Sequence, residues 1–305
     1  MPSKAKGYEG HPRPRVMTAH VLRWALSELA LRRCVVLATV LTTSGSVPGK
    51  TGARLAMSSH QHAWKGTVGG AGLEHLVLVR CEELLKTSHR PTAEVVTYGL
   101  NKGAKGYEVT PLDSLCGGRV TISIEVMTPM PHVLLLGGGH CGEALAQTIH
   151  GLGWAHSVHD TRPEFATKER YPHAQQCSTG PVDEFMTALI ANDLSFFSDV
   201  LLLGHDWSED QQRLLLLLQA VAGTPSLDGE TAPRIGVIGS RSKWQAFEAH
   251  CLEQGVEASL LNQVVCPIGL NIGAETPEEI AVAVAAQIMA SHTRVDPTAP
   301  NWRHS

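Results

Sequence analysis

Apolar residues in the first half of the chain follow a mixture of helical and strand patterns. Residues 18–33 carry apolar side chains at helical spacing, and the apolar, β-branched run from Cys34 to Leu41 follows as a strand. A second helix is expected to end near Leu85, after a glycine-rich segment, and further strands are expected at residues 94–98 and 119–126. The pattern predicts an α+β domain.

The pattern changes after the segment Thr128-Pro129-Met130-Pro131, where two prolines within three residues disfavour both a helix and a central strand. From there on, a strand, a loop and a helix recur, which is typical of a parallel sheet covered by helices. The second half is therefore predicted to be a Rossmann-like, doubly wound α/β domain. Its expected strands are residues 132–136, 155–160, 175–178, 199–203 and 234–238.

Two helix starts carry capping signals. Ser208 with Gln211 predicts one start, and Thr276 with Pro277 and Glu279 predicts the start of a closing helix that runs to about residue 291. Together with the prolines, these signals divide the chain into three parts. The predicted parts are an N-terminal domain at residues 16–128, the Rossmann-like domain at residues 132–292 and a C-terminal tail at residues 293–305.

Charge and composition exclude several classes of protein. The 305 residues include 25 Lys and Arg against 29 Asp and Glu, a formal net charge of −4, so no nucleic-acid partner is expected. No stretch approaches the ~18 consecutive apolar residues of a membrane span. The first sixteen residues also lack the apolar core of a secretory signal, so we expect a cytoplasmic protein without a membrane partner. Seven scattered cysteines without a Cys-x-x-Cys pair disfavour a disulfide framework and a structural zinc site.

A glycine motif, Gly-x-Gly-x-x-Gly, follows the strand expected at residues 132–136 and precedes a helix. Gly137 allows a tight turn, Gly139 lets a phosphate approach the backbone, and Gly142 permits close packing of helix on strand. Asp160 ends the next strand, where a carboxylate can accept hydrogen bonds from ribose hydroxyls. Strand, glycines, helix and acid together predict a site for a nucleotide or a pterin phosphate. The alternative is that the glycine loop is only a sharp turn.

Polar residues follow other strands of the expected parallel sheet at the same edge. His140 lies inside the glycine loop, His205 follows the strand at residues 199–203, and Ser240 and Arg241 follow the strand at residues 234–238. Ligands of open α/β sheets bind at this edge, where Arg241 could contact an anion. Each of these residues, taken singly, is more often a solvated loop residue than a ligand contact.

A cysteine stands on a glycine turn in the first half, where Cys116-Gly117-Gly118 directly precedes a strand. Such a thiol is accessible to a ligand. The competing interpretation is a small buried residue at the start of a strand, since free cysteines are usually buried and inert. From the residues alone, a buried and inert Cys116 is the favoured interpretation.

Segments of both halves resemble the XdhC (CoxI) family, whose members assist the maturation of xanthine dehydrogenase and related molybdenum hydroxylases. Three positions depart from the family pattern, namely Ala71 within the second glycine segment, Cys141 in the glycine loop and Gly204 before His205. The resemblance covers nearly the whole chain and is carried by residues 45–54, 66–74, 116–120, 136–142, 159–165, 204–206, 238–241, 266–274 and 276–281.

The resemblance implies a cofactor, partners and a role. It implies that the chain binds molybdenum cofactor (Mo-molybdopterin), protects its sulfurated form and delivers it to a xanthine dehydrogenase-type hydroxylase, with a cysteine desulfurase as second partner. The chain is then a maturation chaperone without catalytic residues, and Cys116 is the expected soft contact to the metal. The residues expected at the cofactor are Cys116, Gly117, Gly118, Gly137, Gly139, His140, Gly142, Asp160, His205, Ser240 and Arg241.

Two other functions remain open on the residues alone. An NAD(P)-dependent oxidoreductase would use the three glycines of the loop and Asp160, although no proton-relay constellation is evident. A regulatory sensor would bind a nucleotide without turnover. The oligomeric state is also open, with a symmetric homodimer as the commonest outcome.

Overall fold

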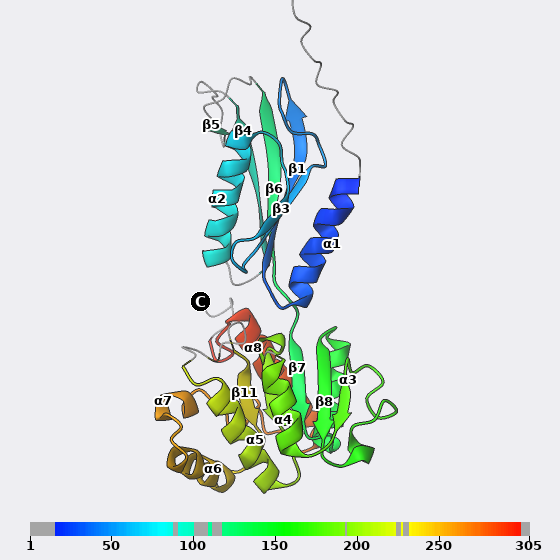
Figure 1. Cartoon of the computed structure of the whole chain (residues 1–305), viewed down its shortest axis with the longest axis vertical. Helices are drawn as coiled ribbons and strands as arrows, with labels where there is room; N and C mark the ends of the chain where they lie inside the picture. The colour runs from blue at the N-terminus through cyan, green and yellow to red at the C-terminus, as the bar shows by residue number, and fades with distance from the viewer. Residues whose placement is uncertain are drawn as a thin grey trace, which may run out of the picture. The chain divides into compact units, whose positions relative to one another are not determined.

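The computed structural model describes residues 16–87, 91–100, 109–111, 118–192, 194–223, 227 and 232–299. The chain divides into two units, Met1–Pro129 and Met130–Ser305, and each is described by itself (Figure 1). The predicted α/β class is confirmed, with a mainly antiparallel sheet in the first unit and a parallel, Rossmann-like sheet in the second. Within the described ranges, no helix has the length and apolar character needed to cross a membrane.

The first unit is a six-stranded sheet with one helix on each face (Figure 1). Helix α2 (Ala71–Thr87) packs Leu73, Val77 and Cys81 against one face, and α1 (Val16–Ala30) packs Val21 and Ala25 against the other. The strand order is β3-β2-β1-β6-β4-β5. The strands are β1 (Val35–Ser44), β2 (Arg54–Ser58), β3 (Trp64–Gly66), β4 (Thr92–Gly99), β5 (Val109–Pro111) and β6 (Arg119–Met127).

Strands β1 and β6 form the longest pairing of this sheet. They run antiparallel from Val35 opposite Met127 to Ser44 opposite Arg119, with a register shift between Val40 and Thr42. The pairing places the glycine-rich turn after β1 beside Gly118, the described residue directly before β6.

The second unit is a five-stranded parallel sheet in the order β11-β10-β7-β8-β9. Successive residues of the central strands point to opposite faces, so both faces are apolar and both are covered by helices. Helices α3 and α8 pack on one face, and α4, α5, α6 and α7 pack on the other. The strands are β7 (His132–Leu136), β8 (Ala155–Asp160), β9 (Cys177–Thr179), β10 (Asp199–Leu202) and β11 (Arg234–Val237). The helices are α3 (His140–Gly151), α4 (Val182–Ala191), α5 (Trp207–Ala220), α6 (Arg241–Glu253), α7 (Ala258–Leu261) and α8 (Pro277–Thr293), with short 3₁₀ helices η1 (Pro163–Phe165) and η2 (Leu194–Phe196).

The two predicted capping signals had different outcomes. The Thr276 side chain and the Glu279 side chain form a complete capping box at the start of α8, with Pro277 in the first turn, as predicted. The predicted start at Ser208 is wrong, because the Asp206 carboxylate accepts the Ser208 amide at 2.8 Å and α5 begins at Trp207. A carboxylate two residues upstream serves as the N-cap, so Ser208 becomes part of the first turn.

Candidate ligand-binding site

The glycine loop joins β7 to α3 and is held by close backbone contacts. Gly137 has a φ of 124°, and a Cβ atom there would lie 2.6 Å from the Leu203 carbonyl carbon. A Cβ atom at Gly142 would overlap with the Gly137 carbonyl oxygen. These two glycines are therefore required by the packing of the loop itself, as the sequence predicted for a tight turn and a close helix.

Gly139 differs from the other glycines of the loop because the space that a side chain would occupy is open. It is the N-cap of α3 with an ordinary φ of −75° and no side-chain cap, and a Cβ atom there would meet nothing within 4 Å. The first intrahelical donor is Glu143, whose amide bonds the Gly139 carbonyl. In the described part of the chain, no acceptor contacts the amides of Gly139, His140 and Cys141. A helix N-terminus with unpaired amides and open space is suited to an anion such as phosphate.

The Asp160 carboxylate lies at the end of β8 and is bonded within the protein. Its Oδ1 accepts from the Arg162 amide and Nε, both at 2.9 Å, and its Oδ2 accepts from the Gly138 amide at 2.8 Å and Arg162 Nη2 at 3.0 Å. Burial by itself raises the pKa of this carboxyl, but the bonds from Arg162 and Gly138 outweigh burial and lower the pKa to about 2. Asp160 is therefore ionised at neutral pH and connects β8 to the glycine loop.

The segment after Asp160 packs onto the glycine loop. The Arg162 guanidinium carbon lies 3.7 Å from the centre of the Phe165 ring, and the Arg170 guanidinium carbon lies 4.8 Å from it. A Cβ atom at Gly138 would overlap with the Phe165 carbonyl oxygen. Helix η1 therefore contacts the loop through backbone atoms, which explains why the middle glycine has no side chain.

The rim residues predicted from the sequence all lie at the carboxyl edge of the sheet, where β7, β10 and β11 end in register. His140 and His205 are exposed, and so is Arg241 in the first turn of α6. Ser240 serves the fold, because its Oγ caps α6 by accepting the Lys243 amide at 3.3 Å.

A buried charge network at the same edge was missed by the sequence prediction. Asp210 is fully buried and pairs with Arg213 at 3.2 Å and with Lys243 at 2.9 Å, while the Thr161 hydroxyl donates to Glu209 at 2.9 Å. The spacing of Asp210 and Arg213 along a helix is a signal that sequence could have offered. The contacts to Thr161 and Lys243 depend on which strands are neighbours, which the spacing does not reveal.

Glycine segments of the first unit also come together. A Cβ atom at Gly49 would overlap with the Val68 carbonyl oxygen, and one at Gly118 would overlap with the Ser44 carbonyl oxygen. These contacts place the turn after β1 against both the turn before α2 and the start of β6. Cys116 and Gly117 lie outside the described residues, so their predicted contact with a cofactor stays a prediction.

Metal-ligating side chains do not gather in the described part of the chain, where no group of three or more His, Cys, Asp and Glu residues is placed to hold an ion. Cys141 lies in the first turn of α3, where burial and then the charge of Glu278 raise the pKa of its thiol. This thiol is therefore protonated at neutral pH and is a weak metal ligand.

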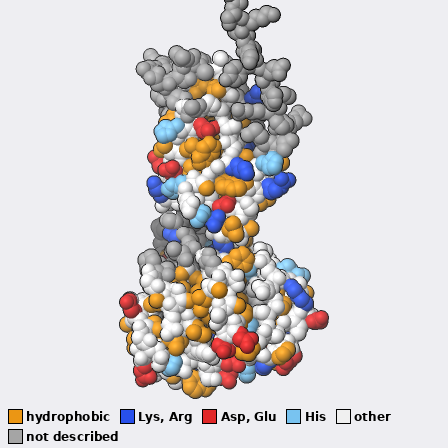
Figure 2. Space-filling model, viewed as in Figure 1, with side chains coloured by type: hydrophobic (Ala, Val, Ile, Leu, Met, Phe, Trp, Pro, Cys, Tyr) orange, Lys and Arg blue, Asp and Glu red, His pale blue; other side chains and the backbone are white. Residues whose placement is uncertain are grey.

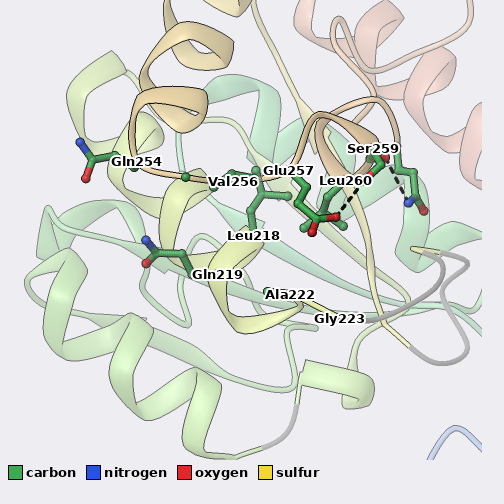
Figure 3. Close-up of a pocket in the computed structure, with 11 residues that line it drawn as sticks. Leu218, Gln219, Ala222, Gly223, Gln254, Val256, Glu257, Ser259 and Leu260 are labelled. Carbon is green, nitrogen blue, oxygen red and sulfur yellow. Dashed lines mark hydrogen bonds between the residues drawn. The ribbon is translucent and has the colours of Figure 1, made fainter.

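A pocket of about 460 Å³ lies at the opposite end of α5 and α6 from the glycine loop (Figure 3). Among the described residues that line it, Glu257 is the one charged side chain, so an anionic ligand is not favoured there. Its lining residues are Leu218, Gln219, Ala222, Gly223, Gln254, Gly255, Val256, Glu257, Ser259, Leu260 and Gln263. On the face drawn in Figure 2, acidic and basic side chains of the described residues are interspersed and form no continuous basic area.

Comparisons with known proteins identify relatives of both units. The family model described as "XdhC Rossmann domain" matches residues 133–288, and the model described as "XdhC and CoxI family" matches residues 29–99. An Escherichia coli K12 protein named "Uncharacterized protein YqeB" is 27% identical over 253 residues, which cover 83% of this chain and 42% of that protein. A Bacillus subtilis 168 protein named as a probable xanthine dehydrogenase subunit is 28% identical over 174 residues, covering 56% of this chain and 46% of that protein.

The chain thus spans about half the length of the curated relatives it matches. Among solved structures, one from Bacillus halodurans described as a xanthine dehydrogenase aligns with a TM-score of 0.47 and 16% identity, over 93% of this chain and 98% of that one.

Proposed function

Because the chain belongs to the XdhC family, as the sequence motifs predicted, we propose that it is an accessory protein in the maturation of a xanthine dehydrogenase-type molybdenum hydroxylase. The relative named as a probable xanthine dehydrogenase subunit supports the link to this class of enzyme. In the proposed role, the chain binds molybdenum cofactor, protects its sulfurated form and delivers it to the hydroxylase. A cysteine desulfurase is the expected second partner.

The open space above Gly139 is the observation that carries this proposal. Molybdopterin ends in a phosphate, and the unpaired amides at the start of α3 match a phosphate in charge and in hydrogen-bonding character. The amides of Gly139, His140 and Cys141 would hold that group. When bound, the cofactor would supply the molybdenum centre that the client enzyme requires.

The remaining residues suit a carrier that releases its ligand. The described residues hold no complete set of metal ligands, and a carrier binds reversibly. His140 begins α3 and His205 follows β10, the strand beside β7, and both are exposed at this edge, where they would contact the bound group. Cys116 stays the proposed soft contact to molybdenum.

The experiment compares cofactor retention between two matched glycine variants. Gly139→Ala places a methyl group in the open space without a clash, whereas Gly151→Ala makes the same change at the far end of α3, where a Cβ atom also meets nothing within 4 Å. The full chain and both variants are purified from cells that synthesise the cofactor, and the released small molecules are identified by mass spectrometry together with bound molybdenum.

We expect the wild-type chain and Gly151→Ala to retain pterin and molybdenum, and Gly139→Ala to lose most of both with an unchanged melting temperature. A wild-type chain that never retains pterin, together with normal hydroxylase activity in a deletion strain, would show that the proposal is wrong. Recovery of a nicotinamide dinucleotide would favour the oxidoreductase or the sensor instead.

A further inference from the structure

Asp160 occupies the position where a Rossmann domain uses a carboxylate to bind ribose hydroxyls. Here the two oxygens accept four hydrogen bonds, three from Arg162 and one from the Gly138 amide. An ionised carboxylate has about four lone-pair sites, so the acceptor capacity of Asp160 is used within the chain. A ribose diol would have to displace Arg162 to be bound there.

The residues next to Asp160 also make their contacts within the chain. The Thr161 hydroxyl donates to Glu209 of α5, and the Arg162 side chain lies over the Phe165 ring. The Phe165 carbonyl closes against Gly138. The side of the glycine loop that faces β8 is therefore filled by the chain's own atoms, while the side at Gly139 is open.

We infer that Arg162 is a positioning residue that sets the ligand specificity of the glycine loop: by holding Asp160, it closes the ribose subsite, so the loop takes a phosphate ligand without any gain from an attached adenosine. This inference rests on the proposed phosphate site at Gly139. It selects phosphate esters that lack a ribose diol at this position over adenine dinucleotides.

The test measures what adenosine adds to the binding of a phosphate probe. Pyrophosphate, ADP and NADH are titrated into the full chain by calorimetry, and Gly139→Ala shows which binding belongs to the loop. For the wild-type chain we expect ADP and pyrophosphate to bind with affinities within about twofold of each other, because adenosine finds no acceptor.

Arg162→Met removes the guanidinium donors but keeps an unbranched side chain over Phe165. It frees one acceptor position on each Asp160 oxygen, so ADP should then bind about tenfold more tightly than pyrophosphate. Arg170→Met is the matched control, because Arg170 also lies over Phe165 but pairs with Glu143 instead of Asp160. Its ratio of affinities should equal that of the wild-type chain.

Two results would overturn the inference. One is a wild-type chain that binds ADP or NADH at least about tenfold more tightly than pyrophosphate, with loss of that binding in Gly139→Ala. The other is a folded Arg162→Met variant whose ratio of ADP affinity to pyrophosphate affinity equals that of the wild-type chain. The wild-type titration needs no variant to fold, so it decides the matter if Arg162→Met is unstable.

Failure of the proposed function has a different signature. If the wild-type chain binds none of the three probes, the phosphate site at Gly139 is wrong. The role of Arg162 is then judged by NADH alone: binding that appears in Arg162→Met supports it, and binding in neither chain refutes it.

Discussion

The substitution Asp160→Asn tests the charged connection between β8 and the glycine loop. The buried carboxylate has a pKa of about 2 in the folded chain against 3.8 as the ordinary value, because the bonds from Arg162 and Gly138 outweigh the cost of burial. A folded-state pKa below the unfolded one stabilises the protein above the unfolded pKa, and this stabilisation is lost as the pH falls through the folded pKa. The difference corresponds to about 2.4 kcal/mol at pH 7 and about 1.3 kcal/mol at pH 3.

Asparagine keeps the shape of the side chain but loses the charge, and its amide group turns a donor toward donors. We therefore expect Asp160→Asn to lower the free energy of unfolding by at least about 2 kcal/mol at pH 7, and by about 1 kcal/mol less at pH 3. Urea unfolding at the two pH values, followed by tryptophan fluorescence, measures both numbers, since Trp154 is buried in the same unit.

Glu253→Gln is the control, because this carboxylate is exposed at the end of α6 and should change the free energy by less than about 0.5 kcal/mol. An Asp160→Asn effect that is the same at pH 7 and pH 3 would refute the reasoning, because a purely steric defect does not depend on the ionisation of the carboxyl.

Three further predictions concern the same unit. Gly138→Ala should lower its stability by about 2 kcal/mol or more through the clash with the Phe165 carbonyl, whereas Gly139→Ala should change it by less than about 0.5 kcal/mol; equal melting temperatures for the two variants would contradict this. Lys243→Met should cost about 2 to 4 kcal/mol, because it leaves the buried Asp210 paired with Arg213 alone, and the loss should shrink when Asp210→Asn is added in a double-mutant cycle. Burial and nearby cations lower the pKa of His156 to about 4, so the folded chain disfavours the protonated imidazole. The stabilisation from the neutral side chain is present above about pH 6.5 and is lost as the pH falls toward 4. Between pH 7 and pH 5, the wild-type chain should therefore lose about 2 kcal/mol more in urea unfolding than His156→Leu, and parallel losses would exclude this cause.

The second unit was predictable from sequence because its signals are local and strong. Short apolar runs that end in glycine mark β7, β10 and β11 to within one residue. The strands of the first unit were harder to predict, since β2 and β3 have five and three residues and lie between turns. Strands of that length carry too few alternating positions for a periodic pattern. They are defined by their pairing, of β2 with β1 and of β3 with β2.

In the candidate site, too, features set by the local sequence could be predicted, whereas contacts between distant residues could not. The positions of the glycine loop, Asp160 and the rim residues at the sheet edge were predicted, because each follows a recognisable strand, and their contact with a cofactor stays a prediction. What Asp160 contacts was not foreseen, because the sequence shows the acid but not its partners. Arg162 lies two residues further on, close enough to fold back onto the carboxylate, and this spacing was the available signal.

The internal pairing of charges bears on whether an anion can bind at the glycine loop. Asp160 is neutralised by Arg162, and the fully buried Asp210 by Lys243 and Arg213, so neither carboxylate presents its full charge to the glycine loop. With these charges compensated, the start of α3, which has no side-chain cap, is left to attract an anion through its amides and the helix dipole. That attraction is moderate, because it comes from partial charges and a few amides instead of a cluster of free cations. A moderate attraction suits a protein that must release its ligand to another protein, whereas a tight cationic clamp would favour retention.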